Sequence, residues 1–396
     1  MIIKYPGFLF IGLLLLCFTA CSKKWTDQIR KGAIQEDSFM ETVQLEVQNG
    51  LVFLPVQLKG KTYRFLFDTG APLSVSKEIQ QELDFSKVSK SFISDSDRNR
   101  KQVDWVEVDQ FQIGSISFLK QVAFVGDFTS NPILECLNID GIIGSNLSRQ
   151  CNWLIDHSKQ ACTFSSLNKE VECDDCVSLP FTTDQQYNLF LNINVGQAKI
   201  RNILLDYGSN GTLSLEGRFF TKLEGQGLIG DFFSEEGFQQ RGIVGKAVPM
   251  NRKLYLSDSV SWAGITIDDV LIQTSKSTSI GTGLLSRFLV HIDWSKRQLH
   301  LKKREDLPKK NKRTPGFKFG YNDEEGIYVQ SVMLESDAYR QGLRPKMKVL
   351  QLDTLDFTGK HTFCDYVAYT SGQEAFLRVV KDSTSNLELS CSQLNF

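Results

Sequence analysis

The sequence predicts a mainly β protein made of two similar tandem lobes and a smaller C-terminal module. Motifs recur at a nearly constant spacing: Asp68 and Asp206 are 138 residues apart, as are two Leu-Ser-Arg motifs that begin at positions 147 and 285. An Ile-Asp-x-Ser-Lys motif begins at 155 and again at 292, a spacing of 137. Short apolar runs also alternate with turn residues, which is typical of strands. Motifs in constant register indicate a duplicated unit, so each copy is expected to form one lobe.

The first 21 residues read as an export signal. Lys4 is the only charge before an apolar stretch from Phe8 to Phe18, which is too short for a stable membrane span. Small residues then precede Cys21. This resembles a bacterial lipoprotein box, in which the cysteine is lipidated and becomes the mature N-terminus. We therefore expect residues 22–40 to be a tether. The protein is then anchored by lipid in the bacterial cell envelope, at the outer membrane facing the periplasm. An ordinary signal peptide or an uncleaved anchor is the alternative.

Each lobe is expected to begin with a β-hairpin that delivers an aspartate at a strand end. The first lobe spans roughly residues 41–167 and the second 178–304. The predicted hairpin strands are Val52–Leu58 and Tyr63–Phe67 in the first lobe, and Leu189–Val195 and Ile200–Leu205 in the second. Later strands are expected at 103–113, 116–125, 253–262 and 265–272, with short helices at 77–83 and 216–223.

Composition excludes some classes of function. The 396 residues include 45 basic and 46 acidic side chains, which argues against a nucleic-acid-binding surface. Neither a metal-ligand constellation nor a phosphate-binding glycine loop occurs in the sequence, so we expect no cofactor and no metal. Nine cysteines occur. The spacing of Cys173 and Cys176 is typical of half a zinc or redox site, but no second pair follows. A local disulfide, or two unpaired thiols, is the better interpretation.

The turn Asp68-Thr69-Gly70-Ala71 resembles the catalytic turn of retropepsin and pepsin-like aspartic proteases. Asp140 to Gly144 (Asp-Gly-Ile-Ile-Gly) resembles the second landmark of that family, which crosses behind the catalytic loop. Lobe two repeats both features as Asp206-Tyr207-Gly208-Ser209 and Ser279-Ile280-Gly281. The resemblance covers residues 41 to 304. It implies two acid-protease β-barrel lobes, and both halves of the site within one chain, hence a monomeric catalytic unit.

The resemblance also implies a chemistry. Asp68 and Asp206 would hold a water, one acting as general base and the other as general acid in the hydrolysis of a polypeptide substrate. Glycine after each turn lets another backbone approach closely. The residues expected to support the two turns are Thr69, Gly70, Ala71, Gly208 and Ser209. A flap over the cleft is expected between residues 91 and 102.

Lobe two departs from the family pattern. The family carries Thr or Ser after each catalytic Asp, and its hydroxyl forms a hydrogen bond across the lobes. Thr69 fits this pattern, whereas the phenol of Tyr207 is too long, so that bond is expected to be missing or replaced. A second hypothesis therefore stays open: a catalytically inactive envelope lipoprotein that uses the protease fold to bind peptides or protein partners.

The C-terminal part, residues 314–394, follows a basic linker at 305–313. A strand at 326–329, a short helix ended by Gly342 and a strand at 349–353 together resemble a PDZ domain of the bacterial protease type. Lys346-Met347 departs from the usual Gly-Asp of that family. PDZ domains bind peptide C-termini as an added strand. The segment Gly316, Phe317, Lys318, Phe319 and Gly320 is the candidate carboxylate-binding loop. The alternative is a docking module that binds nothing.

Overall fold

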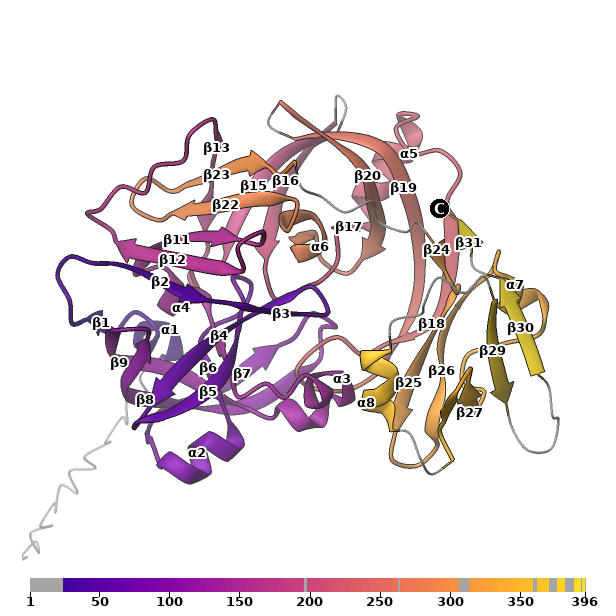
Figure 1. The fold of residues 1–396 in the computed structure, drawn as a ribbon, viewed down its shortest axis with the longest axis horizontal. Helices are drawn as coiled ribbons and strands as arrows, with labels where there is room; N and C mark the ends of the chain where they lie inside the picture. The colour runs from indigo at the N-terminus through magenta and orange to yellow at the C-terminus, as the bar shows by residue number, and fades with distance from the viewer. Residues whose placement is uncertain are drawn as a thin grey trace, which may run out of the picture.

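The computed structural model describes residues 24–195, 198–262, 264–305, 313–358, 362–369, 376–381, 388–392 and 394–395. Most of their regular structure is strand and the helices are short, so the predicted mainly β class is confirmed (Figure 1). Within these ranges no helix combines the length and the apolar character needed to span a membrane. The lipidation candidate Cys21 lies outside the described residues, as does most of the predicted linker.

The first lobe is built on one large sheet with strand order β1-β9-β6-β10-β5-β4-β8-β7, and β3 pairs with β4. Its strands are β1 (Ala33–Ile34), β3 (Glu46–Gln48), β4 (Leu51–Leu58), β5 (Lys61–Phe67), β6 (Ser74–Ser76), β7 (Ser86–Ser94), β8 (Arg100–Ile113), β9 (Ile116–Gly126) and β10 (Gly141–Ile143). Its helices are α1 (Trp25–Gln28), α2 (Lys77–Leu83), η1 (Phe128–Ser130), α3 (Pro132–Cys136) and α4 (Ser145–Ser148). The predicted helix at 77–83 is confirmed as α2. Ser76 caps its N-terminus, since the Ser76 side chain accepts from the Ile79 N–H at 3.1 Å.

The second lobe repeats this plan in a sheet with strand order β14-β15-β16-β21-β17-β20-β19-β18, which β26 and β25 then extend. Its strands are β14 (Thr182–Thr183), β15 (Leu189–Val195), β16 (Ala198–Asp206), β17 (Leu213–Glu216), β18 (Phe233–Gln239), β19 (Val248–Trp262), β20 (Ile265–Ser275) and β21 (Ser279–Gly281). Its helices are α5 (Gly217–Gly225) and α6 (Thr282–Leu285). In both lobes the landmark strand lies parallel to the strand that ends at the aspartate: β10 beside β5, and β21 beside β16.

A six-stranded sheet joins the two lobes, in the order β13-β23-β22-β11-β12-β2. Its strands are β2 (Met40–Gln44), β11 (Cys151–Asp156), β12 (Ala161–Ser166), β13 (Val177–Pro180), β22 (Phe288–Asp293) and β23 (Gln298–Lys303). The repeated Ile-Asp motifs meet here, since Ile155 lies opposite Val290 and Trp153 opposite Ile292. One apolar core runs through both lobes and this sheet, and it includes the fully buried Trp153, Phe164 and Trp262.

The C-terminal module lies against both lobes (Figure 1). It consists of β25 (Phe317–Asn322), β26 (Gly326–Met333), α7 (Asp337–Arg340), β27 (Val349–Leu352), β28 (Leu355–Asp356), α8 (Phe363–Ala368), β29 (Phe376–Lys381) and β30 (Glu388–Ser392), with β24 (Arg313–Thr314) pairing β31 (Leu394–Asn395). Strand β26 pairs with β18 of lobe two, and a disulfide joins Cys364 of α8 to Cys136 of α3 in lobe one.

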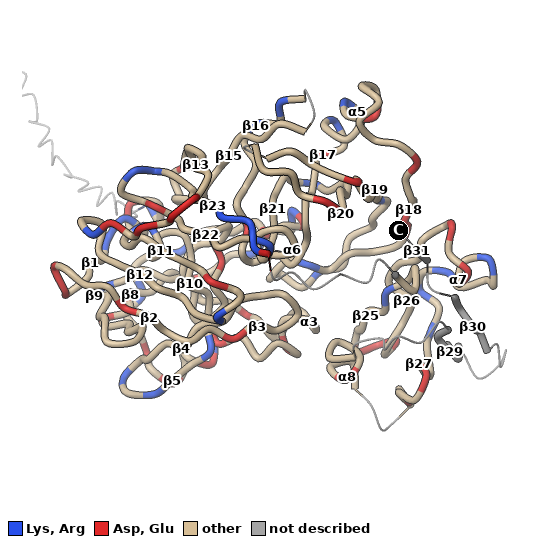
Figure 2. Tube along the Cα trace, turned by 45° about the horizontal axis from the view of Figure 1, so that its top comes forward, with Lys and Arg blue, Asp and Glu red and all other residues tan. Residues whose placement is uncertain are grey.

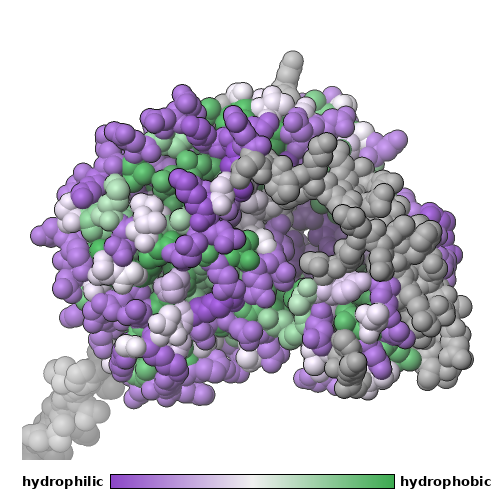
Figure 3. Space-filling view, in the orientation of Figure 1, coloured by the Kyte–Doolittle hydropathy of each residue, from purple (hydrophilic) through white to green (hydrophobic). Residues whose placement is uncertain are grey.

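The surface is mixed in character. Acidic and basic residues are interspersed along the chain, apart from a basic run, Lys302 to Arg304, at the end of β23 (Figure 2). The face in Figure 3 is mostly hydrophilic, with apolar residues scattered between the polar ones. Among the described residues, the exposed large apolar side chains are Met40, Val47, Phe92 and Leu167.

Candidate active site

Each candidate catalytic aspartate stands at the end of a strand that a short parallel strand supports. In lobe one, β5 ends at Phe67, and the Asp68 N–H donates to the Ile143 carbonyl in β10 at 3.1 Å. In lobe two, β16 ends at Asp206, which lies opposite Gly281 of β21. The apolar strands before both residues are largely buried, so the carboxylates are held by rigid elements.

Two glycines allow the carboxylates to approach each other. A Cβ atom on Gly70 would lie 3.3 Å from Oδ1 of both Asp68 and Asp206, so the two carboxylates border the same small volume. A Cβ atom on Gly208 would lie only 2.2 Å from Oδ2 of Asp68, which is an overlap. The Gly70 N–H donates to Oδ1 of Asp68 at 2.7 Å. The structure therefore brings together the two residues that the repeat register pairs.

Burial shapes the electrostatics of the pair, because removing a carboxylate from water disfavours its ionised form. Burial raises the pKa of Asp68 to about 6, against the opposing hydrogen bonds from the N–H groups of Gly70 and Gly208. Burial and the negative charge of Asp68 together raise the pKa of Asp206 to about 8, against the opposing charge of Arg241. The two groups titrate as a pair, and between those pH values they share one proton.

The cross-lobe contact is preserved on one side only. Thr69 is fully buried; its hydroxyl donates to the Leu205 carbonyl and accepts from the Tyr207 N–H at 3.3 Å. Tyr207 returns no such bond: its ring is fully buried edge-on against Phe67, with 5.4 Å between centroids. Within the described residues the Tyr207 hydroxyl is buried without a hydrogen-bond partner. An aromatic contact thus replaces the reciprocal hydrogen bond.

The next residue of each turn is held through its backbone. The Ala71 carbonyl accepts from the Ser145 N–H at 2.8 Å. The Ser209 carbonyl accepts from the Thr282 N–H at 2.7 Å, and its hydroxyl accepts from the Gly211 N–H at 3.3 Å. These bonds fix the shape of each turn around its aspartate.

The predicted flap is a hairpin formed by β7 and β8, and we call residues 91–102 the lobe-one flap. Its tip is bound to lobe two. The Asp97 side chain is fully buried, and its carboxylate accepts from the Gln239 side chain at 2.7 Å and from the Arg241 N–H at 2.7 Å. The Gly242 N–H adds a third bond at 3.2 Å, and the Arg241 guanidinium lies 3.7 Å from the same carboxylate.

Sequence reasoning missed a second flap. Residues 240–247 connect β18 and β19, and we call them the lobe-two flap. This segment lies over lobe one, where the Asn131 side chain donates to the carbonyls of Gln240 at 3.2 Å and Gly242 at 2.9 Å. Arg241 of this flap acts electrostatically on Asp206. A counterpart of 91–102 at the repeat spacing falls at 229–240, which covers β18 and the first residue of this flap, so the repeat spacing pointed to this hairpin.

The candidate carboxylate-binding loop of the C-terminal module is a strand, so that part of the prediction is wrong. Phe317 and Phe319 are buried while Lys318 between them is exposed, and this alternation is the signature of β25. Gly320 lies within β25 opposite Tyr328, and only Gly316, at φ 75°, precedes the strand. The Phe319 N–H donates to the Tyr366 hydroxyl of α8 at 3.1 Å.

The described part of the chain contains no group of three or more His, Cys, Asp or Glu side chains that could hold a metal ion. Cys173 and Cys176 form a disulfide, which was one of the two interpretations of that pair. Two cysteines of the six-stranded sheet, Cys151 and Cys162, are free and buried. Burial raises the pKa of the Cys162 thiol to about 12, which makes it a poor nucleophile.

A comparison with known protein families finds a match within the first lobe. The family described as aspartyl protease matches residues 54–147, which run from β4 to α4 and include Asp68 and the first landmark. An aspartyl protease domain is therefore present. Among solved structures, conglutin gamma, a basic 7S globulin from lupine seeds, is similar at 11% identity with a TM-score of 0.41, covering 67% of this chain and 95% of its own. No curated protein matches this chain.

Proposed function

We propose that this protein is an aspartic endopeptidase that hydrolyses polypeptides with a water held between Asp68 and Asp206. One observation carries the proposal: two carboxylates at equivalent repeat positions border the same small volume, where a Cβ on Gly70 would touch both. A pair of carboxylates that border one volume and repel each other's charge can hold one proton between them, which is the state that acid–base hydrolysis requires. The aspartyl protease match over residues 54–147 supports the same chemistry.

Burial raises the pKa of both carboxylates, so the pair can hold one proton between them. The ionised member of the pair takes a proton from the water, whose oxygen then attacks the peptide carbonyl carbon. The protonated member gives its proton to the carbonyl oxygen. Collapse of the tetrahedral intermediate breaks the C–N bond, and a proton moves to the leaving amine. No cofactor enters this scheme.

The setting of the enzyme is part of the proposal. We place it in the bacterial cell envelope, anchored by lipid at Cys21 and facing the periplasm. The C-terminal module is proposed to be PDZ-like and to engage peptides of substrates or partners. The order of β26, α7 and β27 supports this. Its edge strand β25 is the surface for an added strand, although Tyr366 caps the Phe319 N–H on that side.

A second function is favoured by one observation. The Tyr207 side chain returns no cross-lobe hydrogen bond, so the turn of lobe two lacks the side-chain bond that Thr69 gives the turn of lobe one. A protein that binds peptides in the cleft without cleaving them would tolerate this loss. Such a protein would bind peptides equally well after Asp206→Asn.

The test uses the full chain purified in detergent, with an unfolded polypeptide as substrate. Both Asp68→Asn and Asp206→Asn are expected to abolish cleavage, while Asp109→Asn, an exposed carboxylate on β8, leaves it unchanged. Cleavage that survives Asp68→Asn would refute the proposal. Absence of cleavage in the native chain, together with peptide binding that survives Asp206→Asn, would establish the binding function instead.

A further inference from the structure

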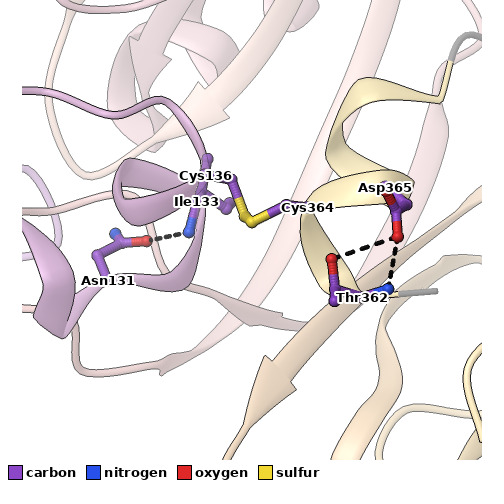
Figure 4. Close-up of a disulfide and its surroundings, with 6 residues drawn as sticks. All are labelled: Asn131, Ile133, Cys136, Thr362, Cys364 and Asp365. Atoms are coloured by element: carbon purple, nitrogen blue, oxygen red, sulfur yellow. Dashed lines mark hydrogen bonds between the residues drawn. A yellow bond between two sulfur atoms is a disulfide. The ribbon is translucent and has the colours of Figure 1, made fainter. Parts of the chain in front are cut away.

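The disulfide Cys136–Cys364 joins two parts of the molecule that are 228 residues apart in sequence. Cys136 ends α3 of lobe one, and Cys364 lies in the first turn of α8 in the C-terminal module (Figure 4). The module is therefore bonded covalently to lobe one. Ile133 of α3 also packs against the apolar core of the module.

The second attachment of the module is to lobe two. Strand β26 pairs with β18, placing Met333 opposite Glu235 and Ser331 opposite Gly237. Gly237 has φ 139°, and a Cβ there would lie 2.2 Å from the Gln330 carbonyl oxygen, so only glycine allows the two strands to lie this close.

The buried carboxylate of Glu235 reinforces this strand pairing. Glu235 is 3% exposed; it accepts from the Ser331 hydroxyl at 2.6 Å and pairs with Arg252 of β19 at 2.7 Å. Lys318 of the module lies 3.8 Å away. Burial opposes ionisation of Glu235, but the charges of Lys318 and Arg252 outweigh it and lower its pKa to about 2. Strand β18 is therefore joined to the module by backbone pairing and by the bonds of Glu235 to Ser331 and Lys318.

Strand β18 leads directly into the lobe-two flap, and α3 holds that flap. Asn131 caps α3 by accepting from the Ile133 N–H at 2.9 Å, while its amide group binds the flap carbonyls of Gln240 and Gly242. The Ser130 hydroxyl adds a bond to the Ile243 carbonyl at 3.1 Å. The same short segment of lobe one thus carries the flap contacts at one end and the disulfide at the other.

These contacts form a closed ring that runs through lobe one, the disulfide, the module, β26, β18 and the lobe-two flap, and returns to lobe one. The disulfide and the β18–β26 pairing hold the base of the flap near lobe one, so that with both intact the flap can lift only by breaking its own hydrogen bonds to lobe one and bending beyond β18. The flap bonds to Asp97 and Asn131 are noncovalent and can open reversibly. The disulfide is the one covalent bond between lobe one and the module in the described residues.

The disulfide is also accessible. Cys364 is exposed and Cys136 partly so. An exposed disulfide can be attacked by an external thiolate, in contrast to a buried one. The predicted envelope setting is a compartment in which such bonds form and persist.

We propose that Cys136–Cys364 is a redox site that controls access to the cleft: the oxidised chain is closed and the reduced chain opens. A dithiol reductant is the partner. One of its thiolates attacks the Cys364 sulfur and releases the Cys136 thiolate, which takes up a proton. The second thiol of the reductant then displaces Cys364, so that two electrons and two protons reach the chain and the reductant becomes a disulfide. That access matters for catalysis rests on the proposed function.

The experiment follows hydrogen exchange at the Arg241 and Gly242 amides, which donate to Asp97 in the closed cleft. The full chain is compared before and after dithiothreitol, and as a Cys136→Ser/Cys364→Ser variant. The control variant is Cys173→Ser/Cys176→Ser, which removes the other disulfide. Loss of Cys136–Cys364 is expected to speed exchange at both amides about tenfold or more, since local opening governs it. The control should leave it unchanged.

Two results would overturn the proposal: equal exchange in oxidised and reduced chains, or faster exchange that extends equally to the core strand β5. The second would mean that the disulfide only stabilises the whole fold. Cleavage of a long unfolded polypeptide is expected to rise severalfold on reduction, with a smaller rise for a short peptide. If no form cleaves anything, the proposed function fails, but the exchange result still decides whether the disulfide controls the flap.

Discussion

The substitution Gly208→Ala tests the geometry of the carboxylate pair directly. The added methyl would lie 2.2 Å from Oδ2 and 2.3 Å from Cγ of Asp68, well inside van der Waals contact. Because Asp68 is held by a buried strand and by the Gly70 N–H, the methyl cannot be accommodated without moving that carboxylate or separating the lobes. Overpacking of this kind costs about 1–3 kcal/mol.

The effect on catalysis is expected to exceed the effect on stability. A displacement of about 1 Å at a reacting group costs on the order of a hundredfold in rate. We therefore expect kcat/KM for polypeptide cleavage to fall at least about a hundredfold, while the free energy of unfolding falls by only about 1–3 kcal/mol. Unfolding in urea and initial cleavage rates measure the two quantities on the same preparation.

The matched control is Gly217→Ala, at the first residue of α5, where a Cβ would meet nothing within 4 Å. Alanine is the better helix former, so this variant is expected to be unchanged or up to about 1 kcal/mol more stable, with full activity. Wild-type kcat/KM in Gly208→Ala would refute the close approach of the two lobes at Asp68.

Four further outcomes follow from the same contacts. Thr69→Val leaves the Leu205 carbonyl and a backbone N–H unpaired in the core, so urea unfolding should show a loss of about 2–4 kcal/mol, against little change for the exposed Thr62→Val. Tyr207→Phe removes a buried hydroxyl that lacks a partner in the described residues, and should raise stability by about 1 kcal/mol; a loss of that size would reveal a hidden partner. Glu235→Gln removes the charge that pairs with the buried Arg252 and should cost about 3–5 kcal/mol. The matched change Glu236→Gln, at a partly exposed neighbour, should cost under about 0.5 kcal/mol. Folding raises the pKa of both Asp68 and Asp206, so their contribution to stability is complete below about pH 4 and is lost as the pH rises through about 6 and 8. The double variant Asp68→Asn/Asp206→Asn should therefore have a higher Tm than the native chain at pH 9 but not at pH 4.

The repeat register made the fold and the candidate pair predictable. A spacing of 138 residues placed Asp68 and Asp206 at equivalent strand ends, and β10 and β21 do lie in equivalent parallel pairings. Sequence patterns correctly predicted the elements that are stabilised by residues close by in the chain. The helix at 77–83 has its own Ser76 cap, and the lobe-one flap is a hairpin of neighbouring strands.

Long-range contacts were not predictable. Nothing in the sequence near Cys136 indicates a partner 228 residues away, and seven cysteines beyond the signal leave many pairings open. The docking of β26 on β18 depends on edge strands meeting in space, which strand periodicity does not report. The prediction of a loop at residues 316–320 was wrong for a related reason. The glycines in this segment suggested a turn, but Phe317 and Phe319 are buried in the module core, and this burial fixes an extended strand.

In the structure, the effect of Tyr207 on the carboxylate pair reduces to the loss of one side-chain hydrogen bond between the lobes. The hydrogen bond from lobe two to Thr69 comes from a backbone N–H, which any residue other than proline at position 207 supplies. What tyrosine removes is the reciprocal hydroxyl, and its ring contacts Phe67, the residue before Asp68. The lobes are thus joined beneath the dyad by two hydrogen bonds at Thr69 and one aromatic contact. Because a buried aromatic pair contributes roughly as much as one hydrogen bond, the exchange preserves the position of the dyad even though it changes the contact. The other charged group that acts on Asp206 is Arg241 of the lobe-two flap, which opposes the rise of its pKa.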